Sequence, residues 1–247
     1  MNNALLSINN LSVGYHQEIL SNIFLTADRG EVIGLIGRNG SGKSTFLKTL
    51  VGILPALKGD IHINEASLFS ISSNKRAKKI SIVLSNRINQ PIKVFDFLKM
   101  GRYIHKSNFM RNNPLDMKVV KKVSSDLKIE HLFSSLLNEL SDGEHQKIMI
   151  ARALIQDTPV MLFDEPTTHL DLENKALIIR LLKEISKKHQ KTIILSTHEI
   201  NFIITKIDKI WEVRNKTITE IEKKNISSLF CSDMLYYDED CKIFRLA

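Results

Sequence analysis

Two periods of apolar residues recur along the 247-residue chain, and together they predict an α/β fold. Residues 4–26 alternate loosely between apolar and polar side chains, which indicates two or more strands around a turn. From about 90 to 157 the pattern becomes mostly helical. The other expected elements are a strand, loop and helix over 31–54, strands at 61–64, 79–85, 159–166 and 192–199, a helix over 172–189 and a hairpin over 207–222.

The order of these elements predicts one domain over all 247 residues, with an α/β core and a helical insertion. Residues 1–88 and 158–222 form the core, which includes an antiparallel β subdomain. Residues 89–157 form the inserted α-helical subdomain, and 223–247 form a small C-terminal appendage. Neither an internal repeat nor a low-complexity tract divides the chain further.

Composition narrows the class of protein only a little. Apolar residues make up 43% of the chain and charged residues 25%, as in ordinary globular proteins. No apolar run approaches the roughly 18 residues needed to cross a bilayer, and the stretch MNNALLSINNLSVGY lacks the features of a secretion signal. Cys231 and Cys241 are expected to be free cytosolic thiols.

The net charge of +8 would suit nucleic acid or an anionic membrane surface, but the lysines are spread along the chain and decide nothing. The densest clusters lie at 75–79 and 183–191. The second belongs to the 172–189 helix, so its lysines are expected to form a solvated face. The apolar face of that helix is expected to comprise Leu177, Ile178, Leu181, Leu182 and Ile185.

A glycine-rich stretch, GRNGSGKST, lies between the expected strand and helix of 31–54. It satisfies the pattern G-x-x-x-x-G-K-[ST], and strand, loop and helix are the context in which such a loop cradles phosphates. We expect Lys43 to reach the outer phosphates of ATP and Ser44 to ligate Mg²⁺. The nucleotide-binding stretch comprises Gly37, Arg38, Asn39, Gly40, Ser41, Gly42, Lys43, Ser44 and Thr45.

Polar side chains end two of the expected strands, at the edge of the sheet where ligands gather in open α/β folds. Asp164 follows four apolar residues and is placed to hold hydrated Mg²⁺. Glu165 is the natural general base or water-polarising group. His198, at the tip of the 192–199 segment, is a candidate to bond the γ-phosphate or the attacking water.

The segment LSDGEHQKIMIARAL, at 140–154, begins with a serine and a glycine just ahead of a helix, which makes a second anion-binding helix N-terminus. A single active site has no use for two such devices. A head-to-tail dimer does, because Ser141 and Gly143 of each chain would close over the γ-phosphate bound to the other chain.

With these motifs, the chain from about residue 4 to its end resembles the nucleotide-binding subunit of ABC transporters, which implies a RecA-like P-loop NTPase core. The signature is LSDG where the family more often has LSGG, so Asp142 replaces a glycine. The resemblance implies that Asp171, in THLD, is the D-loop acid and that His198 is the switch histidine. It also implies that Tyr15, in VGY, stacks on adenine; a buried tyrosine at a strand edge is the alternative.

The resemblance departs from the family at the Q-loop glutamine, which touches Mg²⁺ and links the site to the membrane partner. The residue that follows the strand KISIVLS at the corresponding place is Asn86. Its amide is one methylene shorter, so a bridging water would be needed to reach the metal. Gln90, four residues on, is the alternative candidate.

The stretch VFDFLKMGRYIH, at 94–105, resembles the importers of iron–siderophores, haem and vitamin B12, as do DEPTTHLDLENK and the tail from Asp240 to Arg245. This branch implies a homodimeric ATPase docked on two integral membrane permease subunits at the cytoplasmic face of the membrane. A periplasmic or lipoprotein substrate-binding protein would act with it indirectly, and we expect no nucleic-acid partner.

The resemblance leaves rival functions. A soluble ABC ATPase acting on ribosomes or DNA, and an ABC ATPase that serves another transported substrate, share these motifs. A P-loop kinase of a small metabolite would have no use for LSDGEHQ. Intact Asp164, Glu165 and His198 argue against a regulatory module that binds ATP without hydrolysing it.

Overall fold

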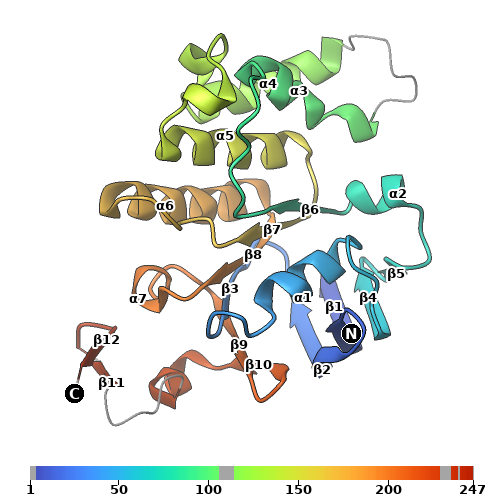
Figure 1. Ribbon diagram of the computed structural model, residues 1–247, viewed down its shortest axis with the longest axis vertical. Coiled ribbons are helices and arrows are strands. Elements are labelled where there is room, and N and C mark those ends of the chain that lie inside the picture. The colour runs from blue at the N-terminus through green and yellow to red at the C-terminus, as the bar shows by residue number, and fades with distance from the viewer. Residues whose placement is uncertain (1–3, 106–113, 229–234, 239, 247) are drawn as a thin grey trace.

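The computed structural model describes residues 4–105, 114–228, 235–238 and 240–246, and it is built around a six-stranded sheet (Figure 1). The strand order is β10-β9-β3-β8-β7-β6, parallel throughout except for the antiparallel edge strand β10. Every residue of β3, β7 and β8 is buried, which explains why these strands read as continuous apolar runs. The strands are β3 (Val32–Ile36), β6 (Ile80–Val83), β7 (Val160–Asp164), β8 (Thr192–Thr197), β9 (Lys209–Arg214) and β10 (Thr217–Ile221).

Alternate residues of the central strands pack into two separate apolar cores, one on each face of the sheet. Leu35 and Leu162 face α1 (Lys43–Leu50) and its neighbours. Ile36 and Phe163 face the helices of the opposite layer, α5 (Asp142–Ile155) and α6 (Leu172–His189). The sheet thus separates the two helices whose N-termini were singled out as anion-binding.

A second, antiparallel sheet covers the α1 side, in the order β2-β1-β4-β5. Its longest strands, β1 (Leu6–Gly14) and β2 (Glu18–Ala27), confirm the pair of strands expected over 4–26. The sheet is completed by β4 (Lys58–Ile63) and β5 (Ala66–Ser67). Because its inward residues join those of α1 in one core, the glycine loop rests between two sheets.

The expected helical insertion is present, with α5 packed against α3 (Val94–Met100) and α4 (Pro114–Asp126) in the upper part of Figure 1. Arg102 ties these helices together: its Nε donates to Asp116 Oδ1 at 2.9 Å and its Nη1 to the carbonyl oxygen of Ile155 at 3.1 Å. Both side chains of the ion pair are largely buried. Short 3-10 turns connect the helices at Tyr103–His105, Glu130–Leu132 and Leu137–Glu139.

Helix α6 has the limits expected from the sequence, but one residue of its apolar face was wrong. Leu177 is exposed, whereas Ile178, Leu182 and Ile185 are buried as expected. Lys187 and Lys188 are exposed, as a solvated face requires, but the lysines of 183–191 also form ion pairs. Lys183 Nζ donates to both carboxylate oxygens of Asp208 at 2.6 and 2.7 Å, and three further lysines pair with acids of neighbouring elements, in the ion pairs Lys187–Asp208, Lys188–Asp126 and Lys191–Asp157.

Several short elements were not predicted from the sequence, because brief segments leave little periodicity. They are α2 (Ser73–Ala77), α7 (Ile200–Ile203), the 3-10 segment Lys223–Ser228, β11 (Leu235–Asp238) and β12 (Ile243–Leu246).

Cys241 is free and exposed, as expected, while Cys231 lies outside the described residues. No helix in the described ranges has both the length and the apolar character needed to span a bilayer.

Candidate functional site

The glycine loop leaves β3 and enters α1 through a backbone that only glycine tolerates easily. Gly42 is the N-cap of α1 with φ of 102°, and a Cβ there would lie 2.8 Å from Ile19. A Cβ at Gly37 would lie 2.8 Å from Ser41 Oγ. Because Gly42 has no side chain to cap the helix, the first amides of α1 point into the loop without a partner from the helix. The loop is therefore shaped to receive an anion.

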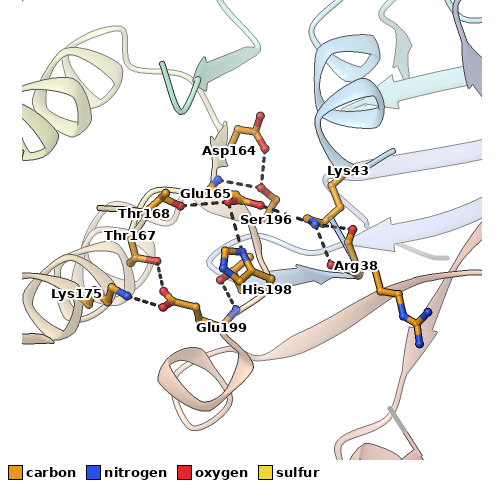
Figure 2. A network of polar contacts seen from close by, with 12 residues as sticks. Arg38, Lys43, Asp164, Glu165, Thr167, Thr168, Lys175, Ser196, His198 and Glu199 are labelled. Carbon is orange, nitrogen blue, oxygen red and sulfur yellow. Dashed lines mark hydrogen bonds and ion pairs between the residues drawn. The ribbon is translucent and has the colours of Figure 1, made fainter. Parts of the chain in front are cut away.

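Lys43 is the cation of this loop, and its side chain is almost wholly buried. Its Nζ donates to the carbonyl oxygens of Gly37 and Arg38 at 2.8 and 3.1 Å and lies 3.8 Å from Glu165 Oε1 (Figure 2). Burial lowers the pKa of Lys43, while the nearby carboxylates of Glu165 and Asp164 act in the opposite direction. A phosphate would satisfy this partly desolvated ammonium better than two carbonyls do.

Asp164 ends β7 as a buried carboxylate, and its partner is a serine of the next strand. The register of β7 and β8 places Ser196 directly opposite Asp164. Ser196 Oγ donates to Asp164 Oδ1 at 2.7 Å and accepts the backbone N–H of Glu165 at 2.9 Å (Figure 2). One hydroxyl thus fixes both the side chain of the first acid and the backbone of the second.

Glu165 has a left-handed backbone, with φ of 48°, in which a non-glycine residue costs about 1–3 kcal/mol. Its Oε2 accepts the hydroxyl of Thr168 at 3.1 Å and lies 3.4 Å from His198 Nδ1. Such strain at a functional residue persists only where the surroundings hold it. Here Ser196 holds the backbone N–H of Glu165, and Thr168 and His198 contact its carboxylate beside Lys43 (Figure 2).

The turn that carries His198 is anchored from the side by a second acid, Glu199. Lys175 of α6 forms an ion pair with Glu199, and Thr167 donates to its Oε2 at 3.4 Å (Figure 2). The backbone N–H of Glu199 donates to Thr197 Oγ1 at 2.9 Å. These contacts restrict the position of His198 relative to Glu165.

The second phosphate-binding candidate lies at the N-terminus of α5. Ser141 is the N-cap, and its Oγ accepts the backbone N–H of Glu144 at 3.4 Å. In return, Glu144 Oε2 accepts the Ser141 amide at 3.0 Å and its hydroxyl at 2.7 Å, and these bonds lower the pKa of Glu144. Gly143 is buried beside α6, where an added Cβ would lie 2.6 Å from Asn174 Oδ1.

The structure brings together only part of the set of residues that the sequence singles out. Lys43, Asp164, Glu165 and His198 converge, whereas α5 lies in the layer across the sheet from α1 (Figure 1). No hydrogen bond or ion pair of the described residues joins Tyr15, Asn86 or Asp171 to Lys43 or Glu165, and Asn86 is exposed after β6. Tyr15 is 57% exposed in the β1–β2 turn, which removes the alternative of a buried tyrosine. Asp171 caps α6, where its Oδ1 accepts the Asn174 amide at 2.8 Å.

Mg²⁺ fits this site only together with phosphates. Among the residues described, no three Asp, Glu, His or Cys side chains are grouped as a metal site. Mg²⁺ is commonly bound through one or two protein oxygens plus substrate phosphates and waters. The Asp164 carboxylate and the Ser44 hydroxyl, from the strand and the helix beside the glycine loop, are suitable oxygen donors.

The residues of this site that were missed from the sequence include Ser196, Thr168, Lys175 and Glu199. Ser196 left a usable signal, because it is a polar residue inside the apolar strand TIILST, two residues before His198. Such a side chain, buried in a strand, needs a polar partner. The other three lie in polar stretches, where their sequence neighbours give no hint of a contact.

Comparison with known proteins places the chain in a family. The family model for ABC transporters matches residues 20–168. The chain is 34% identical to an uncharacterized ABC transporter ATP-binding protein of Methanocaldococcus jannaschii, over 87% of this chain and 74% of the relative. It is also 34% identical to the achromobactin transport ATP-binding protein CbrD of Dickeya dadantii, over 84% and 78%. Identity to the iron(3+)-hydroxamate import ATP-binding protein FhuC of Bacillus subtilis is 31%, over 79% and 74%.

Solved structures agree on the fold. The chain superposes on cbiO1 of Clostridium perfringens, part of the ABC transporter complex cbiONQ, with a TM-score of 0.81, 26% identity and 92% of both chains covered. A chain from an inward-facing putative metal-chelate type ABC transporter gives 0.78, 25% identity, and 98% and 96% coverage. These likenesses confirm the expected P-loop NTPase fold. The chain belongs to the ABC transporter family, as an ATP-binding subunit with ATPase activity, and its relatives include ATP-binding proteins named for achromobactin transport and iron(3+)-hydroxamate import.

Proposed function

We propose that this chain is the ATPase of an importer that takes up an iron–siderophore, haem or cobalamin-type metal chelate through a separate permease. The observation that carries the ATPase part is the convergence of Lys43, Asp164, Glu165 and His198 beside a glycine loop. The core of 1–88 and 158–222 holds the nucleotide, the subdomain of 89–157 carries the signature, and 223–247 is an appendage.

In this mechanism the amides of Gly40 to Thr45 and the ammonium of Lys43 hold the triphosphate, and Tyr15 stacks on adenine. Lys43 exchanges its bonds to the loop carbonyls for bonds to phosphate oxygens. Asp164 and Ser44 would hold Mg²⁺, which would neutralise part of the charge of the triphosphate.

Glu165 accepts a proton from the attacking water, and His198, 3.4 Å from its carboxylate, bonds the γ-phosphate or orients that water. A general base typically contributes about 10²–10⁴-fold to the rate. Ser196 holds the backbone of Glu165, and Thr168 holds its carboxylate, while the proton moves.

Two copies of the chain close head to tail around two nucleotides, so that Ser141 and Gly143 of one copy meet the γ-phosphate held by the other. The separation of α5 from α1 within one chain supports this arrangement. Asp171 lies at the start of α6, whose residue Asn174 lies beside Gly143, and so belongs to the same surface. Closure would then be passed to the permease through Asn86 and the described residues that follow it, 87–105.

The choice of substrate class rests on the relatives. Two of them are named for transport of achromobactin and iron(3+)-hydroxamate, and others are called probable iron chelatin transport ATP-binding proteins. An iron–siderophore is therefore the first candidate, with haem and cobalamin as related chelates. The subunit would sit at the cytoplasmic face of the membrane, on two permease subunits served by a substrate-binding protein, and no nucleic acid takes part.

Uptake by a strain that lacks the gene tests the transport role. We expect uptake of an iron-labelled siderophore to fail and to be restored by the native gene but not by the Glu165→Gln variant. The same comparison with haem and cobalamin identifies the chelate. Normal uptake of all three chelates in the deletion strain would contradict the proposal.

Whether Asn86 occupies the Q-loop position can be tested in the reconstituted complex with the permease. Lengthening the side chain in Asn86→Gln should change the ATPase rate, the coupling of hydrolysis to transport, or both, because the amide would then reach the metal directly. If neither quantity changes, Asn86 does not occupy the Q-loop position.

A further inference from the structure

The first turn of α5 carries two carboxylates, Asp142 and Glu144, at the helix end where the proposed function places the partner's triphosphate. This is an unfavourable start for an anion site, because each carboxylate opposes the positive potential of a helix N-terminus. The first turn of α1, by contrast, holds no acid and begins with Lys43. The α5 end therefore needs its negative charge to be compensated.

Of the two acids, Asp142 is the one that matters for an incoming phosphate. Glu144 is turned back on the N-cap, where the amide and hydroxyl of Ser141 both bond its carboxylate. Asp142 replaces the family's more usual glycine, and its side chain is 54% exposed. An incoming γ-phosphate that bonded Ser141 would meet the carboxylate of the very next residue.

A single arginine meets this carboxylate. Arg87 lies in the segment that follows β6, and its Nη1 forms an ion pair with Asp142 Oδ1 while its Nη2 donates to the carbonyl oxygen of Leu140. Two donors of one rigid guanidinium thus hold residues on both sides of Ser141. The positive charge is fixed at the helix end, although 55 residues of chain separate it from Asp142.

A second basic side chain near Arg87, His145, does not share this role. It is buried one turn into α5. Burial, and then the charge of Arg87, lowers the pKa of His145, which disfavours the charged form of its ring. Arg87 is left to balance Asp142.

We propose that Arg87 is a charge-balancing residue of the signature: by neutralising Asp142 it allows an aspartate-containing signature to close over the triphosphate held by the partner chain. The inference rests on the proposed function, since it requires the head-to-tail sandwich. It assigns Arg87 an electrostatic role at a nucleotide that lies in the other subunit's glycine loop. A chain with glycine at position 142 would have no need of it.

Sedimentation of the full-length Glu165→Gln chain with Mg²⁺ and ATP measures this effect, as the protein concentration at which ATP-dependent dimers form. In that background Arg87→Ala leaves a bare carboxylate, and the protein concentration needed for dimers should rise about tenfold, which corresponds to about 1.4 kcal/mol. Asp142→Asn leaves a bare guanidinium, so the required concentration should fall below that of the parent. The double variant should return close to the parent, and all differences should shrink in high salt.

A mechanical clasp between the two segments predicts a different pattern. In that case Arg87→Ala and Asp142→Asn would both weaken dimerisation, and the double variant would be no worse than either; this pattern, or an unchanged Arg87→Ala variant, overturns the inference. Arg180→Ala, which removes a similar charge from the exposed Arg180–Glu184 pair of α6, should leave dimerisation unchanged. If the parent itself forms no ATP-dependent dimer, the sandwich fails, and the charge balance with it.

Discussion

At the N-terminus of α1 the capping residue is Gly42, which has no side chain to bond the first amides, and the next residue is the cation Lys43. At the N-terminus of α5 the capping residue is Ser141, whose amide and hydroxyl are bonded to Glu144, and the next residue is the anion Asp142. The first helix end is open and basic, whereas the cap of the second is already bonded to Glu144 of the same helix. Both were singled out from the sequence for the same reason, as sites for phosphate.

The difference indicates when each end binds. The amides of α1 can accept a triphosphate at once, because only the bonds of Lys43 to two carbonyls need to be exchanged. The α5 end must give up or share the bonds of Ser141 with Glu144 before it can bond a phosphate. We therefore expect α1 to bind nucleotide in the single chain and α5 to contribute only when two chains close.

The largest effect is expected at the open end. Lys43→Ala removes the cation that faces the outer phosphates, so kcat/KM for ATP should fall about 10²–10³-fold and ATP affinity of the single chain should fall with it. Steady-state hydrolysis and calorimetric titration measure the two quantities. Lys48→Ala, in the last turn of the same helix, is the matched control and should change neither. Unchanged ATP affinity in Lys43→Ala would show that the loop does not cradle the phosphates.

The closed end should behave differently. Ser141→Ala removes a hydroxyl that would bond a charged phosphate, so the protein concentration needed for ATP-dependent dimers should rise about 10- to 100-fold. ATP affinity of the single chain should stay the same. Ser72→Ala, which removes the serine N-cap of α2, controls for the loss of a cap elsewhere. A loss of ATP affinity in the Ser141→Ala monomer would show that both helix N-termini bind the same nucleotide within one chain, and would contradict separate roles for α1 and α5.

The next largest effect is expected at Ser196, which holds Asp164 and Glu165 near the N-terminus of α1. Ser196→Ala leaves the buried Asp164 carboxylate and the Glu165 amide without their shared partner. The free energy of unfolding should therefore fall by about 1–3 kcal/mol, and kcat should fall about tenfold. The Mg²⁺ concentration needed for half-maximal activity should rise. Ser81→Ala removes an equally buried hydroxyl that bonds Thr158, and it should reduce stability while leaving the Mg²⁺ requirement alone. Equal Mg²⁺ requirements in the two variants would reduce Ser196 to a packing role.

The smallest effect concerns Glu144, whose pKa is lowered by its bonds from Ser141. A carboxyl group with a lowered pKa stabilises the fold above its usual pKa, and that contribution is lost as the pH falls through the lower folded value. The melting temperature of the native chain should therefore drop more on acidification than that of Glu144→Gln, by less than about 2 °C. Parallel melting curves for the two chains at every pH would show that Glu144 does not depend on Ser141.

Features that lie close together in the sequence were predictable. Lys43 and Ser44 follow a glycine pattern, Asp164 and Glu165 end an apolar strand, and apolar runs marked the positions of the central strands along the chain. These signals are local, because strand ends and helix starts are set by neighbouring residues. The roles that the resemblance implies for Tyr15 and Asn86 remain predictions.

Features that depend on packing were not predictable. The role of Ser196 follows from the register of β7 and β8, which places it opposite Asp164, and periodicity does not specify a register. Arg87 meets Asp142 only because the segment after β6 returns to α5. In the same way, Lys183 appeared to be solvated until the fold placed Asp208 beside it.

A crystal structure of the Glu165→Gln chain with ATP and Mg²⁺ tests the central claim most directly. We predict a head-to-tail dimer in which Ser141 Oγ of each chain lies about 3 Å from the γ-phosphate held by Lys43 of the other. A complex in which each nucleotide is bound by Lys43 while both Ser141 side chains face away from every phosphate would contradict it.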